Sequence, residues 1–168
     1  YRYGKTDVEV FPLIPTHTYG DLVVYLPKER VLFLGDIAFF YVMPWCHNAH
    51  PTHWIQGLYD LDRMDVRYIV AGHGPLGGKK ELADMRQYLE LMKREARKCY
   101  DMKMSAGAAA AAIDIGKYAN WIGTERQVMN TVRFYQEFAG TVTPDPDAAA
   151  IRRATEEYNA IRNFTVGK

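Results

Sequence analysis

Short apolar stretches with the pattern of β-strands occupy the first part of the chain. Residues 8–11 alternate between apolar and polar positions, which is typical of a strand with one buried face. Residues 22–26 and 31–34 are near-continuous apolar runs, the pattern of strands covered on both faces. The short polar link of Pro27, Lys28, Glu29 and Arg30 between these two runs predicts a tight antiparallel hairpin. A further apolar run at residues 68–71 predicts a strand that leads to His73.

Helical periodicity follows these strands. Trp54, Leu58 and Leu61 recur at helical spacing, with Thr52 placed to cap a helix. Residues 79–104 predict a long amphipathic helix. Its apolar stripe consists of Leu82, Met85, Leu89, Met92 and Ala96.

The last third of the chain has a helical composition. An alanine run at residues 108–112 has high helix propensity and a cap at Ser105. A capping box that begins at Thr124 predicts a helix ending at Gly140, and Asp145 followed by proline opens a last helix. The predicted fold class is therefore α/β (α+β), with a β-rich part and a helical C-terminal extension.

Composition limits the functions that this chain can have. Its 168 residues are 48% hydrophobic and suffice for one core, and the near-equal numbers of basic and acidic residues, 21 and 20, argue against a nucleic-acid partner. The longest apolar runs are too short to span a membrane. Cys46 and Cys99 form no disulfide framework. No leader is visible, although the chain starts with Tyr1, so we expect a cytoplasmic protein.

Three polar residues stand at the ends of the predicted strands. His17 precedes the second strand, Asp36 follows the third, and His73 follows the fourth between two glycines. Functional sites are often built on loops that rigid strands hold in place, and two imidazoles with one carboxylate suit zinc, iron or manganese. Each residue alone is also typical of a structural turn or of a hydrogen-bonded histidine. We expect the three to converge on a common point.

Four motifs in order carry a family resemblance: THTYGD, VVYLP, VLFLGD and IVAGHGP. Over residues 8–104 the chain resembles the second half of a metallo-β-lactamase-fold hydrolase. The resemblance implies the C-terminal half of an αββα sandwich, so that residues 1–104 form part of this domain and residues 105–168 a helical extension. It also implies a site with two Zn²⁺ ions, Fe or Mn being possible, in which His17 binds the first ion and His73 the second. Asp36 bridges both and is the expected catalytic residue.

The chain departs from the family pattern in one respect. The H-x-H-x-D-H motif, which supplies further ligands to both metals, is absent from its five histidines. The sequence therefore predicts half of a metal site. Strands apolar on both faces would leave one face uncovered, so we expect the missing N-terminal half or a second copy of the chain as a partner.

An aspartate at position 36 narrows the branch, because the main zinc β-lactamases carry cysteine there. The resemblance implies a glyoxalase II-like or lactonase-like hydrolase. Its substrate would be a small-molecule ester, thioester, lactone or phosphoester, attacked by a metal-activated water. Two alternatives stay open: an iron-dependent oxidoreductase of the persulfide dioxygenase type, and a truncated chain without catalysis.

The segment from Pro44 to Trp54 overhangs the metal site in this family and shapes the substrate pocket. We expect pocket-lining roles for some of four side chains in it: Trp45, His47, His50 and His53. Pro51 is expected to break any helix that would align the three histidines. Asp21 is a candidate for orienting a metal-binding ring from behind, or else an exposed turn residue.

Overall fold

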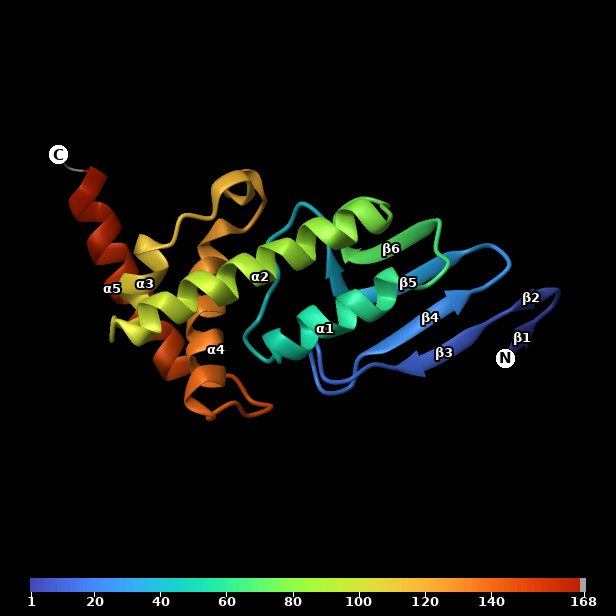
Figure 1. Cartoon of the computed structure of the whole chain (residues 1–168), viewed down its shortest axis with the longest axis horizontal. Helices are drawn as coiled ribbons and strands as arrows, with labels where there is room; N and C mark the ends of the chain where they lie inside the picture. Colours follow the sequence, from blue (N-terminus) through green and yellow to red (C-terminus); the bar gives the residue numbers. More distant parts are fainter. Residues whose placement is uncertain (167–168) are drawn as a thin grey trace.

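The computed structural model describes residues 1–166 and contains a mixed four-stranded sheet in the order β3-β4-β5-β6 (Figure 1). The strands are β3 (Glu9–Pro12), β4 (Leu22–Leu26), β5 (Val31–Phe39) and β6 (Tyr68–His73). The first three are antiparallel, and β6 runs parallel to β5. Leu26 pairs with Val31, which confirms the predicted hairpin. A small pair before the sheet, β1 (Arg2–Tyr3) and β2 (Thr6–Asp7), is too short for a hydrophobic period to predict.

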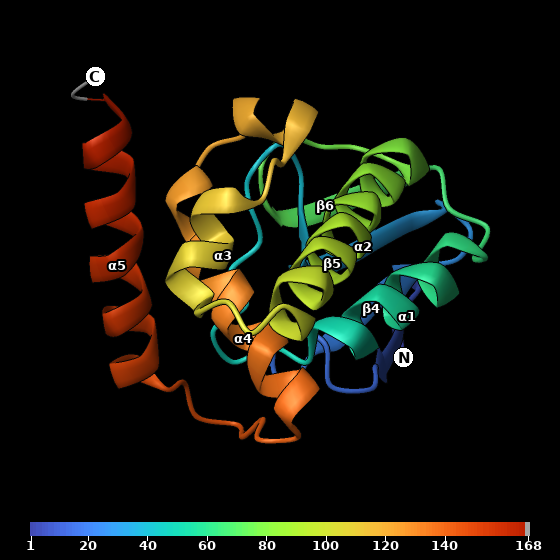
Figure 2. The same cartoon turned by 60° about the vertical axis from the view of Figure 1, so that its left-hand side comes forward.

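Five α-helices complete the described chain. They are α1 (Pro51–Asp62), α2 (Lys79–Asp101), α3 (Ala106–Ala112), α4 (Gln127–Ala139) and α5 (Ala148–Val166). Two 3₁₀ turns, η1 (Gly116–Asn120) and η2 (Thr124–Arg126), lie between α3 and α4. Helices α1 and α2 lie side by side over one face of the sheet, and α5 lies at the far end of the molecule (Figures 1 and 2). Within residues 1–166, no helix combines the length and the apolar character needed to cross a bilayer.

The main core lies between the sheet and the helices α1 and α2. Tyr25, Leu32 and Ile69 face one another across three strands and are buried. Trp54 of α1 is fully buried against this layer, and its indole Nε1 donates to the Ile37 carbonyl at 2.8 Å. A large buried aromatic whose N–H is satisfied contributes apolar area without a desolvation cost. The predicted apolar stripe of α2 is buried from Leu82 to Ala96.

The opposite face of the sheet is apolar, and the described residues 1–166 leave much of it exposed. Val10, Val24, Phe33 and Val70 pair in one row across all four strands. Val10 and Phe33 are about two-fifths exposed, and Leu22 is 57% exposed. Because side chains alternate along strands, this row belongs to the face away from α1 and α2. The sequence pattern of strands apolar on both faces is thus present, with cover on one face only.

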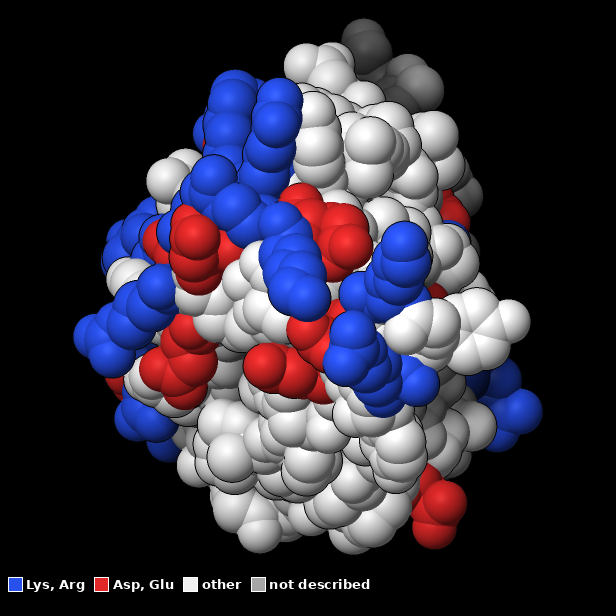
Figure 3. Space-filling model, turned by 90° about the vertical axis from the view of Figure 1, so that its right-hand side faces the viewer, with Lys and Arg blue, Asp and Glu red and all other residues white. Residues whose placement is uncertain are grey.

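The helical extension is joined to the main core. Tyr118 and Phe134 are buried in the same cluster as the sheet residues, whereas Ala110, Val132 and Ala154 form a smaller cluster between α3, α4 and α5. The division into residues 1–104 and 105–168 stays a prediction. On the face in Figure 3, Lys and Arg alternate with Asp and Glu, so this face carries no field of a single sign.

Several local predictions need correction. β5 extends beyond the predicted end at residue 34 to Phe39, so Asp36 lies within an irregular strand and not after it. Neither α1 nor α4 has the side-chain cap predicted for it, because Thr52 is the second residue of α1 and Thr124 begins a 3₁₀ turn. Ser105 does cap α3, accepting from the Ala108 amide at 3.3 Å.

The connection between α4 and α5 has an ordinary helix C-cap at one end and an N-cap at the other. Gly140 ends α4 with a left-handed φ of 69°, as predicted. The last helix begins two residues after Pro146, and its first turn is capped by the Asp147 carboxylate, which accepts from the Ala150 amide at 2.9 Å.

Candidate functional site

The loop between β3 and β4 carries His17 and is fixed by Asp21. The Asp21 carboxylate accepts from the hydroxyls of Thr16 and Thr18, and from the Thr18 amide at 2.9 Å. Its oxygens are thus engaged by the loop that carries His17. Both the role of Asp21 in orienting a metal-binding ring and the alternative of a turn residue stay predictions.

The His17 ring packs against apolar neighbours. Its centroid lies 5.7 Å from that of Phe39 and 5.3 Å from that of Trp54. Burial lowers the pKa of His17 below its ordinary value, against the opposing effect of the carboxylates of Asp21 and Asp36. The ring is therefore neutral at pH 7, which is the form that donates a lone pair to a metal.

Asp36 and His73 are brought together by the parallel pairing of β5 and β6. The register shifts twice between Phe33 and Phe39, and Gly35 in this irregular stretch has a positive φ of 49°. His73 is the last residue of β6, and its carbonyl accepts from the Phe40 amide at 2.9 Å. The His73 Nε2 lies 3.2 Å from the Asp36 Oδ1.

The two glycines around His73 have a steric reason. A Cβ on Gly72 would lie 2.4 Å from the Asp36 Oδ1 and 2.6 Å from the Gly35 carbonyl. A Cβ on Gly74 would lie 2.0 Å from the Phe40 carbonyl oxygen, and φ there is +94°. Glycine at both positions lets β6 approach β5 closely enough for His73 to meet Asp36.

The three predicted ligands line a single cavity of about 250 Å³. Its walls are His17, Asp36, Phe39, Trp45, His47 and His73. Three segments that are distant in sequence therefore converge. Among residues 1–166, however, no group of three or more His, Cys, Asp or Glu side chains is arranged around a single metal position. His17, Asp36 and His73 suit a metal in chemistry and share one cavity, but they do not surround one metal position, so the predicted convergence on a common point is not shown and the metal ligation itself stays a prediction.

Phe39 is a pocket residue that the sequence did not indicate. Its ring stacks on His73 with a centroid distance of 4.5 Å and an interplanar angle of 16°. The Phe39 ring also contacts the His17 ring, with a centroid distance of 5.7 Å. Phe39 lies in an apolar run that reads as core, so no pattern in the sequence distinguishes it.

Trp45 and His47 of the segment from Pro44 to Trp54 also line this cavity, and their role in a substrate pocket stays a prediction. Their ring centroids are 5.3 Å apart, and the Arg126 guanidinium lies 4.9 Å from the Trp45 ring. The His47 Nδ1 is buried without a hydrogen-bond partner within the described residues. Burial lowers the pKa of His47, with further lowering by the nearby His17 and Arg133.

His50 and His53 lie elsewhere, which corrects their predicted place in this pocket. They line a separate cavity of about 900 Å³ between α1, α2 and the end of α4. Pro51 does not prevent their alignment, because it is the first residue of α1, where proline is tolerated, and the two rings stack at 4.8 Å. His50 also forms a 2.6 Å hydrogen bond to the Tyr19 hydroxyl.

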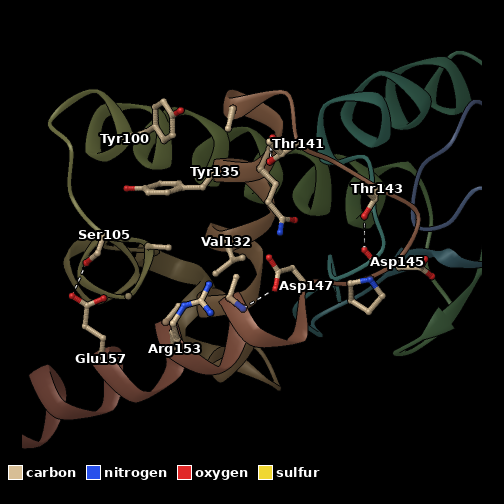
Figure 4. A pocket seen from close by; sticks show the side chains of 17 residues that line it. Tyr100, Ser105, Val132, Tyr135, Thr141, Thr143, Asp145, Asp147, Arg153 and Glu157 are labelled. Atoms are coloured by element: carbon tan, nitrogen blue, oxygen red, sulfur yellow. Dashed lines mark hydrogen bonds between the residues drawn. The ribbon is translucent and has the colours of Figure 1, made fainter.

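A further cavity of about 760 Å³ lies among the helices of the extension (Figure 4). Val132 and Tyr135 of α4 form its floor, Arg153 of α5 faces it, and Ser105 donates to Glu157 at its edge. Burial raises the pKa of Tyr135 to about 12. The residues that line this cavity include no imidazole or thiol. This cavity therefore lacks the imidazoles that the cavity of His17 and His73 provides.

Part of the chain is similar to known proteins. Residues 4–73 match the family model of the metallo-beta-lactamase superfamily. A solved metallo-beta-lactamase from Pontibacter korlensis is 24% identical to this chain, with a TM-score of 0.50. The alignment covers 54% of this chain and 44% of that one. The DIM-1 metallo-beta-lactamase exposed to ceftazidime is 23% identical with a TM-score of 0.46, over 52% of this chain and 45% of its own.

The family-model match confirms the predicted resemblance to this superfamily over residues 4–73, and the Pontibacter korlensis structure shows a similar fold. The chain spans less than half the length of the solved relatives that it matches. The glyoxalase II-like branch is a finer assignment that these comparisons do not reach.

Proposed function

Because residues 4–73 are similar to the metallo-beta-lactamase superfamily and share its fold, we propose that the protein is a metal-dependent hydrolase whose site includes His17, Asp36 and His73. The observation that carries this proposal is their convergence. Three donors from three separate segments line one small cavity, with Asp36 and His73 3.2 Å apart. If these residues served only to form turns, we would not expect two imidazoles and a carboxylate to lie together.

The side chains would divide their roles as the family pattern implies. His17 would hold one ion and His73 the other, and Asp36 would contact both. The metals would be two zinc ions, with iron or manganese as alternatives. When bound, such ions lower the pKa of a water molecule to near 7 and so supply a hydroxide. Phe39 packs against both imidazoles, and Trp45 and His47 line the same cavity.

The remaining ligands would come from residues other than these three. Two histidines and one carboxylate give too few bonds for two firmly bound ions. We propose that the missing donors arrive with the layer that covers the open face of the sheet. That layer would be the other half of an αββα sandwich, because the aligned structure of this fold extends well beyond the part that this chain matches.

The open face supports this arrangement. It carries Val10, Leu22 and Phe33 in exposed positions on neighbouring strands. Contiguous exposed apolar patches mark contact surfaces. Stacked sheets pack about 10 Å apart through faces of this kind. Light scattering of the 168-residue chain alone should therefore show self-association, a second copy covering the face when the proposed layer is absent. A monomer that stays stable at high concentration would contradict this proposal.

Asp36 favours the glyoxalase II-like or lactonase-like branch. The substrate class that we propose is a small-molecule ester, thioester, lactone or phosphoester. Cytoplasmic location also stays a proposal. The deciding experiment combines metal analysis of the complete protein with assays on a thioester, a lactone and a phosphodiester. Turnover of one of them with bound zinc supports the proposal. Bound iron with oxygen consumption on a persulfide would instead favour an oxidoreductase, and no activity with any metal would favour a non-catalytic chain.

A further inference from the structure

One face of α4 carries buried polar side chains directed at the segment that walls the candidate site. Asn130 and Arg133 are 0% and 1% exposed, and Glu137 is mostly buried one turn further on. Their spacing of three and four residues places them in line on one face of the helix. Buried polar groups are costly unless each has a partner, so their contacts indicate what this face does.

Asn130 binds the backbone on both sides of Trp45. Its Oδ1 accepts from the Cys46 amide at 3.1 Å, and its Nδ2 donates to the Pro44 carbonyl at 3.0 Å. The same Nδ2 lies 3.0 Å from the Tyr88 hydroxyl. The carboxamide thus pairs with the wall segment much as a neighbouring strand would.

Arg133 binds the other end of the same segment. Its Nε donates to the Ala49 carbonyl at 2.6 Å, and a terminal nitrogen donates to the Thr143 carbonyl at 2.7 Å. A guanidinium presents several donors in a rigid fork, so one residue can hold two backbone segments in a fixed relation. Glu137 adds a third attachment, accepting from the amide and hydroxyl of Thr52 at 3.0 and 2.7 Å.

The residues between these attachments are those that face the cavity. Trp45 lies between Pro44 and Cys46, and His47 lies between Cys46 and Ala49. Both line the cavity with the predicted ligands. Among the described residues, the buried Nδ1 of His47 has no hydrogen-bond partner, so this nitrogen does not fix the ring. The direction of this wall therefore depends on α4, which lies outside residues 4–73.

We propose that Asn130 and Arg133 are positioning residues for the candidate site, holding residues 44–49 so that Trp45 and His47 face the bound substrate. This inference rests on the proposed hydrolytic function for its effect on turnover. The attachment itself can be measured without any activity. The helical extension would then hold one wall of the substrate pocket in place through α4.

The test compares Asn130→Ala and the milder Arg133→Lys with a matched control, Gln127→Ala. Gln127 is also buried on α4 and also bonds two carbonyls, but these belong to Ala110 and Ile113, away from the wall. Loss of a comparable bond there should reduce stability to a similar degree. Any difference between the variants in local exchange or in KM then reflects the attachment of residues 44–49.

Two readouts separate positioning from stability. Hydrogen exchange should be faster at the Cys46 amide in Asn130→Ala, with little change at the β5 amides that pair with β4; Gln127→Ala should show no such local change. With the complete, zinc-loaded protein and 4-nitrophenyl acetate as probe, KM should rise roughly two- to tenfold in Asn130→Ala and Arg133→Lys, the range for one lost hydrogen bond. A merely unfolded fraction would lower the apparent kcat and leave KM unchanged.

The outcomes are distinguishable. Equal local exchange and equal KM in all three variants would overturn the positioning role. If Asn130→Ala does not fold, Arg133→Lys still tests the positioning role, because lysine keeps the positive charge and lacks the forked donors of the guanidinium. If the wild-type protein hydrolyses no probe while its Cys46 amide depends on Asn130, the proposed function fails and the attachment of the wall by α4 stands.

Discussion

Replacing Gly72 by alanine tests the close approach of β5 and β6 at the candidate site. The new Cβ would lie 2.4 Å from the Asp36 Oδ1 and 2.6 Å from the carbonyl carbon and oxygen of Gly35. Real Cβ contacts below 3.0 Å are essentially absent, so the neighbouring atoms would have to move by at least 0.6 Å, the difference between 3.0 and 2.4 Å. Part of that movement must come from the Gly35 backbone, which, unlike a side chain, cannot rotate away from the new Cβ.

The energetic cost follows from this geometry. Overpacking that forces backbone shifts costs about 1–3 kcal/mol. For a chain of this size, each kcal/mol lowers the midpoint of thermal unfolding by about 2–4 °C, so Gly72→Ala should lower it by about 2–12 °C. The displaced Asp36 should also leave His73, separating two atoms that now lie 3.2 Å apart.

Calorimetry and the NMR signals of the His73 ring measure both effects. Gly20→Ala is the matched control, because Gly20 lies on the His17 loop, has no positive φ, and has nothing within 4 Å of an added Cβ. Its unfolding temperature should change little, within about 0.5 kcal/mol of stability. A Gly72→Ala protein with unchanged stability and an unchanged His73 signal would refute the reasoning about the strand contact.

The remaining predictions concern the site, the open face and an ion pair. Asp36→Ala in the complete enzyme should remove activity and much of the metal with the fold retained, as metal analysis and circular dichroism would show; full turnover with both ions bound would exclude the bridging role. Phe33→Glu should weaken self-association of the isolated chain in light scattering, because it places a charge on the open face. Lys117→Met should raise the lowered pKa of Asp84, whose main cause is the hydrogen bond from Lys117 at 2.7 Å, though Lys80 would keep it partly lowered. A carboxylate whose pKa is lowered in the folded protein stabilises the fold when the pH is above its pKa in the unfolded chain, and this stabilisation is lost as the pH falls. The difference in free energy of unfolding between wild type and Lys117→Met should therefore shrink below about pH 3.9. An Asp84 carbon-13 titration that the substitution leaves unchanged would refute this.

The sequence predicted most of the sheet because the fold depends on apolar periodicity there. The strand at residues 22–26 and the hairpin to Val31 follow from two apolar runs with a short polar link. The run beyond Leu34 was less predictable. Gly35 and Asp36 interrupt the pattern and read as a turn, whereas pairing with β6 keeps them in an irregular strand. Local composition does not reveal a pairing that is made with residues more than thirty positions away.

The candidate site shows a similar limit. His17, Asp36 and His73 were predictable from motifs at strand ends, and they line one cavity. The places of His50 and His53 were not, because Pro51 reads as a helix breaker and acts here as the first residue of α1. Asn130 and Arg133 left a signal that could have been used. They are polar residues on a helix face whose neighbours Phe134 and Val128 are buried, which indicates polar partners in the core.

X-ray absorption and anomalous scattering from the complete protein, purified with its own metal, test the central claim most directly. We predict metal within about 2.0–2.2 Å of ring nitrogens of His17 and His73 and of the Asp36 carboxylate, the distances that zinc keeps to such ligands. The Asp36 contact with His73 would then be replaced by contacts to the ions. Metal bound elsewhere, with the 3.2 Å contact between Asp36 and His73 intact, would contradict the assignment of this cavity as the catalytic centre.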